Sequence, residues 1–432
     1  MSTNYISVNP ARCLRGEISL PGDKSISHRA IILTSIAKGK SIIRGIQRGK
    51  DCLATLNAIE SMGVKIEERD TELIIHGRGH SGLKEPEDVI DCRNSGTTMR
   101  ILAGLLAGQN FYSVLSGDRY LTKRPMRRII EPLRKMGAQI FGRANNRFPP
   151  LTILGGKLRG INYSLPIPSA QVKSCLLLAG LYADGETFIT EPCQSRDHTE
   201  RMLRFLGGEV KVDGLTVKVK GGGSLLGKKI SVPGDISAAS FFMGAAAVLR
   251  GSRVKILNVG INPTRRGLID ILLQMGADIK ITHIDKRCEE EIGEIEVRGG
   301  NTLRGVVVQG ELIPRLIDEI PILAVISCFA EGETIIKDAQ ELRVKETDRI
   351  KAMVNELKKM GADIEEREDG MVIKGSRKLK GAECDSYGDH RIAMALTIAG
   401  LCAKGTTKIL NPECIATSFP EFWKTLEKIS KT

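Results

Sequence analysis

Several short polar clusters interrupt the sequence, each at or near the start of an apolar segment. They combine cations, hydroxyls and amides with a few carboxylates: Lys24, Ser25, Arg29, Asn94, Ser95, Gly96, Thr97, Arg124, Ser169, Gln171, Ser195, Asp318, Lys345, Glu346, Arg349, Asp389, His390 and Arg391. Arginine offers paired donors that match carboxylate and phosphate oxygens, and serine hydroxyls add shorter bonds. The clusters therefore indicate recognition of small anions.

Asp318 and Glu346 stand out in this cationic set. A carboxylate among cations can be a structural ion pair, or it can move protons, because ion-pair networks and active sites perturb pKa values alike. Both interpretations stay open on the residues alone.

The first cluster opens the segment from Leu20 to Lys40. Pro21-Gly22 predicts a turn, residues 25–37 predict a helix apolar on nearly every face, and Gly39 is expected to stop it. Lys24, Ser25 and Arg29 would then lie beside a helix N-terminus, where free N–H groups and the dipole favour an anion. The alternative is a pair of solvated charges at a loop edge.

The same design recurs along the chain. Copies start near residues 20, 94, 168, 233, 317 and 387, about 65 to 85 residues apart, and such a period indicates a repeat architecture. Each copy predicts one buried helix.

A second, amphipathic helix follows in each copy. Residues 349–360 illustrate it, with Ile350, Met353, Val354 and Leu357 at helical spacing between charged positions. Five of these helices end before glycines that fit left-handed caps, Gly63, Gly137, Gly207, Gly276 and Gly361. Short alternating runs complete a βαβαββ unit.

The length and composition set the scale of the fold. The 432 residues, 41% of them apolar, exceed one ordinary core. Six units divide most simply into two α/β domains of three repeats each: residues 20–232, and residues 1–19 plus 233–432. A strand signal at residues 5–8 would join the closing half.

The compartment is expected to be the cytoplasm. No apolar run approaches the ~20 residues of a membrane span, and the first residues lack the pattern of a signal peptide. Ten scattered cysteines without a Cys-x-x-Cys pair predict free thiols and no zinc or other metal site.

The net charge of +13 raises the question of nucleic-acid binding. Aromatic residues make up only 4%, and the basic residues are interspersed with acids. A basic cleft that attracts a small polyanion fits this pattern better. A solvated surface explains most of the remaining charge.

Five motifs, in order, resemble the 5-enolpyruvylshikimate-3-phosphate (EPSP) synthase family, the 3-phosphoshikimate 1-carboxyvinyltransferases. They are PGDKSISHR at 21–29, NSGTTMR at 94–100, KRPM at 123–126, RVKETDR at 343–349 and DHRIAMA at 389–395, and the resemblance runs from about residue 12 to 428. It implies the two-domain enolpyruvyl-transferase fold of six βαβαββ repeats, with the active site in the cleft between the domains.

The resemblance also implies a reaction. The family transfers the enolpyruvyl group of phosphoenolpyruvate to the 5-hydroxyl of shikimate 3-phosphate and releases phosphate through a tetrahedral intermediate, a step towards chorismate and the aromatic amino acids. It uses no metal and no organic cofactor, and it is the target of glyphosate. The partners expected for this chain are those two small molecules, without nucleic acid or membrane, and the chain is expected to be a monomer.

Residue roles follow by motif position. Asp318, Glu346 and Lys24 are the implied catalytic residues. The implied shikimate 3-phosphate ligands are Lys24, Ser25, Arg29, Ser169, Gln171, Ser195, Asp318 and Lys345. Those for phosphoenolpyruvate are Lys24, Gly96, Arg124, Gln171, Arg349 and Arg391.

Three positions depart from the family pattern. Ala170 replaces a frequent serine, Ile101 a frequent proline, and Thr417 a lysine that some relatives place on phosphoenolpyruvate. They bear on a phosphate contact, on the geometry at Gly96 and on a carboxylate contact, respectively.

Two competing functions remain. UDP-N-acetylglucosamine enolpyruvyl transferases share the fold and reaction, but they carry a cysteine on the loop that corresponds to residues 116–123, and none occurs here. A non-catalytic anion- or nucleic-acid-binding repeat protein would leave Asp318 and Glu346 without a role.

Overall fold

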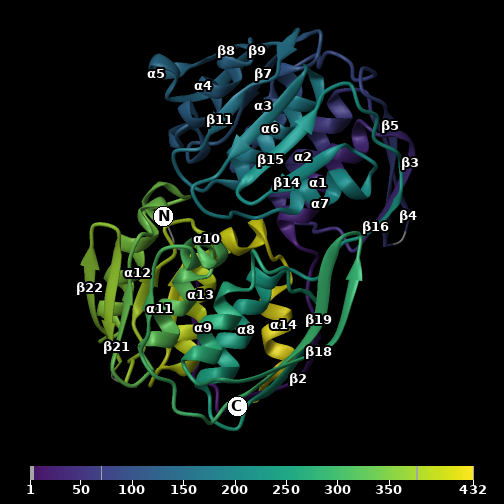
Figure 1. Cartoon of the computed structure of the whole chain (residues 1–432). Coiled ribbons are helices and arrows are strands. Elements are labelled where there is room, and N and C mark those ends of the chain that lie inside the picture. The colour runs from purple at the N-terminus through teal and green to yellow at the C-terminus, as the bar shows by residue number, and fades with distance from the viewer. Residues whose placement is uncertain (1–3, 70, 376–377, 432) are drawn as a thin grey trace. The chain divides into compact units, whose positions relative to one another are not determined.

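The computed structural model describes residues 4–69, 71–375 and 378–431. They form two compact units, labelled by element in Figure 1. Unit 1 comprises Met1–Pro21, Pro233–Asp285 and Glu291–Thr432, and unit 2 comprises Gly22–Val232 and Lys286–Glu290. The domain ranges expected from the sequence also cover residues 1–3, 70, 376–377 and 432, which lie outside the described part of the chain.

Unit 2 contains three four-stranded sheets of one design, in the orders β16-β3-β5-β4, β6-β7-β9-β8 and β11-β13-β15-β14. The first two strands of each are parallel and the remaining pairs antiparallel. The bounds are β3 Lys38–Arg44, β4 Lys65–Arg69, β5 Glu72–Arg78, β16 Lys229–Ser231, β6 Ile90–Asp91, β7 Tyr112–Ser116, β8 Gln139–Gly142, β9 Phe148–Leu154, β11 Asn162–Ser164, β13 Glu186–Thr190, β14 Val210–Asp213 and β15 Thr216–Lys220. Unit 2 also contains a separate two-stranded parallel sheet, β10 Leu158–Arg159 with β12 Ala183–Asp184.

Two kinds of helix accompany these sheets. The buried kind is α1 Lys24–Ser35, α3 Gly96–Ala107 and α6 Ala170–Tyr182, and the amphipathic kind is α2 Lys50–Ser61, α4 Arg127–Lys135 and α7 His198–Phe205. Every residue of α1 from Ile26 onward is buried. Each large apolar side chain in this core contributes about 1.5–3 kcal/mol, so the buried helices organise the unit.

Unit 1 repeats the scheme. Its sheets run β18-β19-β17-β2-β26, β20-β21-β23-β22 and β1-β25-β24. The strands are β1 Tyr5–Val8, β2 Cys13–Ser19, β17 Arg253–Gly260, β18 Asp278–Arg287, β19 Glu290–Arg298, β20 Val307–Val308, β21 Glu333–Ile336, β22 Asp363–Arg367, β23 Gly370–Lys374, β24 Glu383–Asp385, β25 Thr407–Leu410 and β26 Ser430–Lys431. Its buried helices are α8 Ile236–Val248, α11 Ile320–Ser327 and α13 His390–Cys402, and its other helices are α9 Gly267–Gln274, α10 Leu312–Leu316, α12 Arg349–Lys359 and α14 Phe422–Ile429. The described residues thus confirm a mixed α/β fold.

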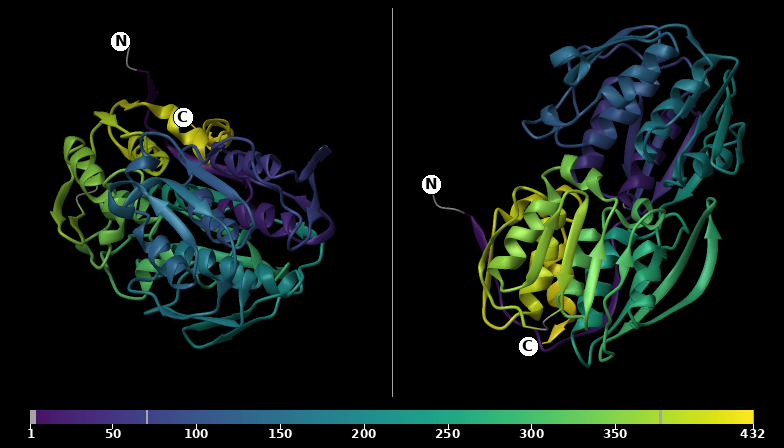
Figure 2. Two further views of the ribbon diagram at one scale, coloured as in Figure 1. Left: turned by 90° about the horizontal axis from the view of Figure 1, so that it is seen from above. Right: turned by 60° about the vertical axis from the view of Figure 1, so that its left-hand side comes forward.

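Each unit contains one strand that directly precedes a helix of the other unit in the sequence. β2 precedes α1 in the chain but pairs in parallel with β17 of unit 1, while β16 precedes α8 but pairs in parallel with β3 of unit 2. β1 pairs with β25, and the views in Figure 2 show this N-terminal strand beside the C-terminal segment. The pattern within one repeat does not identify the partners of β2 and β16, because they lie far away in the sequence.

The predicted helix caps are confirmed in part. Gly63, Gly137, Gly207, Gly276 and Gly361 all have positive φ angles, between 79° and 99°, directly after the amphipathic helices. The prediction for Gly39 is wrong. α1 ends at Ser35 with Ile36 as its cap, and Gly39 lies inside β3 with φ of 87°.

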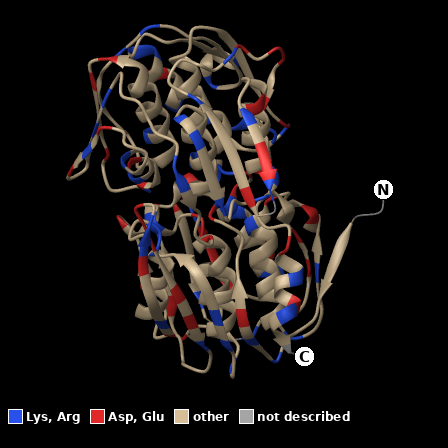
Figure 3. Ribbon diagram, turned by 90° about the vertical axis from the view of Figure 1, so that its right-hand side faces the viewer, with Lys and Arg blue, Asp and Glu red and all other residues tan. Residues whose placement is uncertain are grey.

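Basic and acidic residues are interspersed in the structure, as they are in the sequence. Figure 3 shows Lys and Arg interspersed with Asp and Glu on the helices and strands of each unit. Among the described helices, none is long and apolar enough to cross a membrane.

Candidate active site

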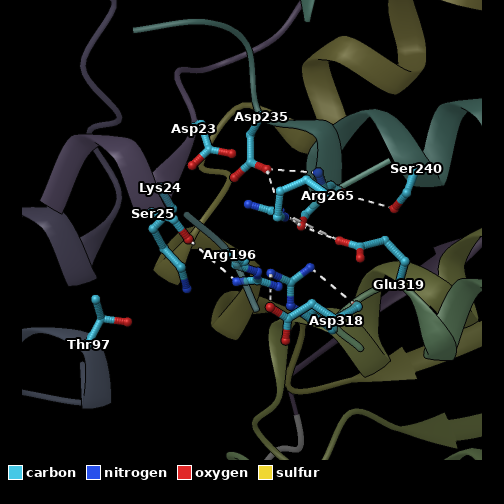
Figure 4. Close-up of polar contacts among 12 residues, drawn as sticks. Asp23, Lys24, Ser25, Thr97, Arg196, Asp235, Ser240, Arg265, Asp318 and Glu319 are labelled. Atoms are coloured by element: carbon cyan, nitrogen blue, oxygen red, sulfur yellow. Dashed lines mark hydrogen bonds and ion pairs between the residues drawn. The ribbon is translucent and has the colours of Figure 1, made fainter. Parts of the chain in front are cut away.

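The N-terminus of α1 in unit 2 presents the first cluster. Asp23 caps the helix by accepting from the Ile26 backbone N–H at 2.9 Å. Lys24 pairs with Asp51 at the start of α2, with 3.0 Å between Nζ and Oδ2. Ser25 accepts from Arg196 at 3.5 Å, a contact drawn in Figure 4. The cluster thus places two cations around a capped helix end.

Arg29 lies one turn further and is buried. Its guanidinium donates to Thr199 Oγ1 at 2.7 Å, to the Ser25 carbonyl oxygen at 2.9 Å and to Ser174 Oγ at 2.7 Å. These two hydroxyls and one carbonyl oxygen orient the guanidinium. A guanidinium held in this way offers paired donors that match the oxygens of a phosphate or a carboxylate.

The N-terminus of α3 forms the second cluster of unit 2. Ser95 caps it by accepting from the Thr98 N–H at 3.1 Å. A Cβ on Gly96 would lie 2.9 Å from Arg124 Nη1 and 3.2 Å from Arg100 Nη1, so two guanidinium groups border this glycine. Helix N–H groups and two arginines together favour a bound anion.

Gln171, at the start of α6, joins this cluster. Its Oε1 accepts from Arg100, and its Nε2 donates to Thr97 Oγ1 at 2.9 Å. Arg100 also donates to the Pro125 carbonyl oxygen at 3.2 Å. The structure therefore brings Gly96, Arg124 and Gln171 together around Arg100.

Ser169 and Ser195 have roles in the fold itself. Ser169 caps α6 by accepting from the Val172 N–H at 3.4 Å. The Ser195 hydroxyl donates to Glu191 Oε1, and its backbone N–H donates to Oε2 of the same residue at 3.3 Å. Ser195 can therefore donate to a ligand only by exchanging its bond to Glu191.

Glu191 belongs to a buried charge cluster. Lys173 Nζ lies 2.6 Å from Glu191 Oε2 and 2.7 Å from Glu200 Oε1, and all three side chains are almost fully buried. Burial alone would lower the pKa of Lys173, but the two carboxylates outweigh it and raise the pKa. Lys173 thus stays charged and fixes Glu191 beneath Ser195.

Unit 1 gathers a different set around Arg349, the first residue of α12. This guanidinium is buried and donates to three carboxylates: Asp389 Oδ2 at 2.8 Å, Asp318 Oδ1 at 3.0 Å and Glu346 Oε2 at 2.6 Å. Burial opposes its charge, but the three carboxylates outweigh that effect and raise its pKa. One cation therefore holds both candidate acid–base residues.

Arg391 brackets Asp318 from α13. Its Nη2 lies 3.6 Å from Asp318 Oδ2, and its Nη1 donates to the Asp318 carbonyl oxygen at 3.4 Å. Two arginines thus orient this carboxylate.

Lys345 lies in the loop before Arg349 and is half-buried. Loss of solvation, opposed by the nearby Asp318 carboxylate, lowers the pKa of Lys345 to about 8. This lysine therefore changes charge close to neutral pH.

Glu319, next to Asp318 in the chain, is fully buried at the start of α11. It accepts from Ser237, which also accepts from Arg265 Nη2 at 2.7 Å. Arg265 lies 3.8 Å from both Asp235 and Glu319, and Figure 4 shows the group. These contacts fix the chain position from which Asp318 projects.

Three residues at these clusters are absent from the sequence-based list of ligands: Arg100, Arg196 and Asp51. Arg100 lies in the first two turns of a buried helix. The criterion that selected Arg29, a cation near the start of such a helix, would therefore also have selected Arg100. Arg196 directly follows Ser195, but no pattern singles it out. The sequence does not show that Asp51 pairs with Lys24, because the pair forms only when α2 packs against α1.

The three unusual positions have ordinary surroundings. Ile101 is buried inside an unbroken α3, and Ala170 is the first residue of α6. Thr417 ends the 3₁₀ helix Pro412–Thr417.

Comparisons with known proteins identify the family. The family model described as EPSP synthase (3-phosphoshikimate 1-carboxyvinyltransferase) matches residues 8–426. The 3-phosphoshikimate 1-carboxyvinyltransferase of Geotalea uraniireducens is 52% identical over 423 residues, 98% of each chain. That of Geobacillus thermodenitrificans is 53% identical over 418 residues, 96% of each chain.

A solved structure agrees. An EPSP synthase from Acinetobacter baumannii is 47% identical, with a TM-score of 0.88 over 99% of this chain and 98% of that one. With matches that span nearly the whole chain and with the resemblance of its five motifs confirmed, this protein belongs to the EPSP synthase family, the 3-phosphoshikimate 1-carboxyvinyltransferases.

Proposed function

We propose that this chain transfers the enolpyruvyl group of phosphoenolpyruvate to the 5-hydroxyl of shikimate 3-phosphate, with the residues of both units serving one pair of substrates. The observation that carries the assignment of roles is that Asp318 and Glu346 share the Arg349 guanidinium, at 3.0 and 2.6 Å. Two carboxylates on one fixed cation can divide the work of accepting and donating a proton.

Phosphoenolpyruvate is assigned to the α3 terminus and to the arginines. Gly96 would expose the helix N–H groups, and Arg124 and Gln171 lie beside it in unit 2. Lys24, Arg349 and Arg391 would complete the charge balance of a phosphate and a carboxylate.

Shikimate 3-phosphate is assigned to the α1 terminus. Lys24, Ser25 and Arg29 would bind it together with Ser169, Gln171 and Ser195, and Lys345 and Asp318 would act from unit 1. Arg29 supports this assignment because hydroxyls of α6 and α7 hold its guanidinium in a fixed position.

The chemistry then has two steps. In the addition, the 5-oxygen attacks C2 of phosphoenolpyruvate as Asp318 accepts the hydroxyl proton, and a proton delivered with the help of Glu346 turns the methylene into a methyl group. In the elimination, a methyl proton leaves and phosphate departs, with Lys24 and the arginines stabilising its charge. The chain is expected to act as a cytoplasmic monomer.

A phosphate-release assay with both substrates tests the proposal. Phosphate should appear only when phosphoenolpyruvate and shikimate 3-phosphate are both present. UDP-N-acetylglucosamine in place of shikimate 3-phosphate should give none. Phosphate release with the nucleotide sugar would assign the chain to the other enolpyruvyl transfer. The absence of phosphate release with both acceptors would contradict an enzyme of this class.

A further inference from the structure

A chain of four buried side chains links α1, α2 and α3 inside unit 2. His28 Nδ1 lies 2.7 Å from Thr55 Oγ1, Thr55 Oγ1 lies 2.7 Å from Thr98 Oγ1, and Thr98 Oγ1 lies 2.7 Å from Ser95 Oγ. All four residues are buried. The chain begins one residue from Arg29 and ends on the residue that caps α3.

The donors in this chain are ordered. Thr98 gives its single hydroxyl proton to Ser95 Oγ, or to the Asp51 carbonyl oxygen at 3.5 Å. Thr55 must therefore donate to Thr98, and His28 Nδ1 must donate to Thr55. The proton of the imidazole is thus on Nδ1.

The other ring nitrogen supports this assignment. His28 Nε2 is buried and has no hydrogen-bond partner among the described residues. Burial, with Lys24 and Arg29 nearby and Asp23 opposing, lowers the pKa of His28 well below its usual value. The ring is therefore neutral and can donate only through the nitrogen that faces Thr55.

We propose that His28 is a positioning residue for phosphoenolpyruvate: through its Nδ1–H it holds the hydroxyl chain that sets Ser95, and with it the N-terminus of α3, relative to α1. The inference rests on the proposed assignment of phosphoenolpyruvate to Gly96 and Arg124. α1 has separate support, from the Asp23 cap and the Lys24–Asp51 pair. Loss of the chain should therefore affect one substrate more than the other.

The kinetic test replaces the middle hydroxyl. Thr55→Val keeps the shape and removes the link, and it should raise the KM for phosphoenolpyruvate about five- to tenfold, the worth of one buried hydrogen bond. The KM for shikimate 3-phosphate and kcat should stay within about twofold. Thr55→Ser keeps the hydroxyl and should restore the KM even if it loses stability.

Two controls separate positioning from stability. Thr34 is also buried on α1, but its hydroxyl donates to the Ala30 carbonyl oxygen of its own helix at 2.6 Å, so Thr34→Val should leave both KM values unchanged. His28→Asn retains a donor near the Nδ1 position and should rescue what His28→Leu loses. Equal rises in both KM values for Thr55→Val, or an unchanged KM for phosphoenolpyruvate with only a lower Tm, would overturn the inference.

The Arg124→Lys variant tests the proposed phosphoenolpyruvate site separately from the positioning role of His28. If that variant leaves the KM for phosphoenolpyruvate unchanged, the proposed site fails and the inference falls with it. If it raises the KM while Thr55→Val does not, only the inference fails.

A spectroscopic test is independent of activity. Selective ¹⁵N labelling of the six histidines, with His28→Asn to assign the signal, should show the Nδ1–H tautomer for His28 at neutral pH. An Nε2–H tautomer or an imidazolium would contradict the ordered chain.

Discussion

The arginines at the candidate clusters of the two units make different hydrogen bonds. In unit 2, Arg29 and Arg100 make the hydrogen bonds described above to hydroxyl, amide and carbonyl oxygens. In unit 1, Arg349 holds three carboxylates and Arg391 lies against one of them. The hydrogen bonds described for these arginines thus go to uncharged oxygens in unit 2 and to carboxylates in unit 1.

This difference suggests a division of labour. The oriented guanidinium groups of unit 2 lie near helix N-termini, whose N–H groups favour anions, so unit 2 is suited to hold the phosphates. A guanidinium paired with carboxylates fixes groups that exchange protons, so unit 1 is suited to the chemistry. A change at Gly96 in unit 2 should then alter binding constants, and a change at Asp318 in unit 1 should alter kcat.

The largest effect is expected for Asp318→Asn. The amide keeps the shape but cannot accept the hydroxyl proton, so kcat should fall roughly 10²- to 10⁴-fold. Binding of shikimate 3-phosphate, measured by calorimetry, should largely survive. If kcat stayed near wild type, Glu346 would become the leading candidate for the base.

Replacing Arg349 or Arg29 by methionine should lower the free energy of unfolding by different amounts. Arg349→Met leaves the buried carboxylate of Asp389 and the half-buried ones of Asp318 and Glu346 without their shared cation, and it should cost about 3–5 kcal/mol of the free energy of unfolding. Arg29→Met removes hydrogen bonds to two hydroxyls and a carbonyl oxygen, and the two hydroxyls already contact each other at 2.7 Å, so it should cost about 1–3 kcal/mol. Urea unfolding measures both, and equal losses would refute the contrast.

Gly96→Ala examines the anion site of unit 2. The added methyl would meet Arg124 at 2.9 Å, so the guanidinium must move before any ligand binds. A misfit of this size is worth on the order of 1–3 kcal/mol, and it should raise the inhibition constant for glyphosate more than the KM for phosphoenolpyruvate. Steady-state inhibition assays give both constants. Equal proportional changes, or a wild type insensitive to millimolar inhibitor, would rule out the idea.

The smallest effect concerns pH. Lys345 has its pKa lowered to about 8, so it is charged below that pH and loses its charge above it. Substrate phosphates are already doubly ionised there, since their second pKa is about 6. The KM for shikimate 3-phosphate should therefore rise by up to about tenfold per pH unit above 8, and Lys345→Arg, whose charge persists, should flatten the profile. The same rise in the arginine variant would assign the titration to another group.

Local signals in the sequence predict local structure well. The buried helices follow from unbroken apolar runs, and the glycine caps follow from the end of each amphipathic pattern. Gly39 is the instructive failure. A glycine with positive φ can also occur inside a strand, and the sequence does not say which element contains it.

Partners distant in sequence limited the prediction of the site. The residue types at the helix N-termini predict anion recognition, but they do not show that Arg29 is buried among hydroxyls from α6 and α7. Nor do they show that the Ser195 proton is already donated to Glu191. The sequence also does not show that two glutamates pair with Lys173, because Glu191 and Glu200 lie in later segments of the chain.

The strand partners of unit 1 bear on the order of events on the ribosome. β2 leaves the ribosome early, yet its partners are β17 and β26, the latter at the other end of the described chain. Apart from Lys286–Glu290, unit 2 is one continuous stretch, Gly22–Val232. Because domains fold as units during synthesis, we expect unit 2 to fold first while β1 and β2 wait with unpaired backbone groups. The nascent chain then needs protection of its first twenty residues for most of its synthesis.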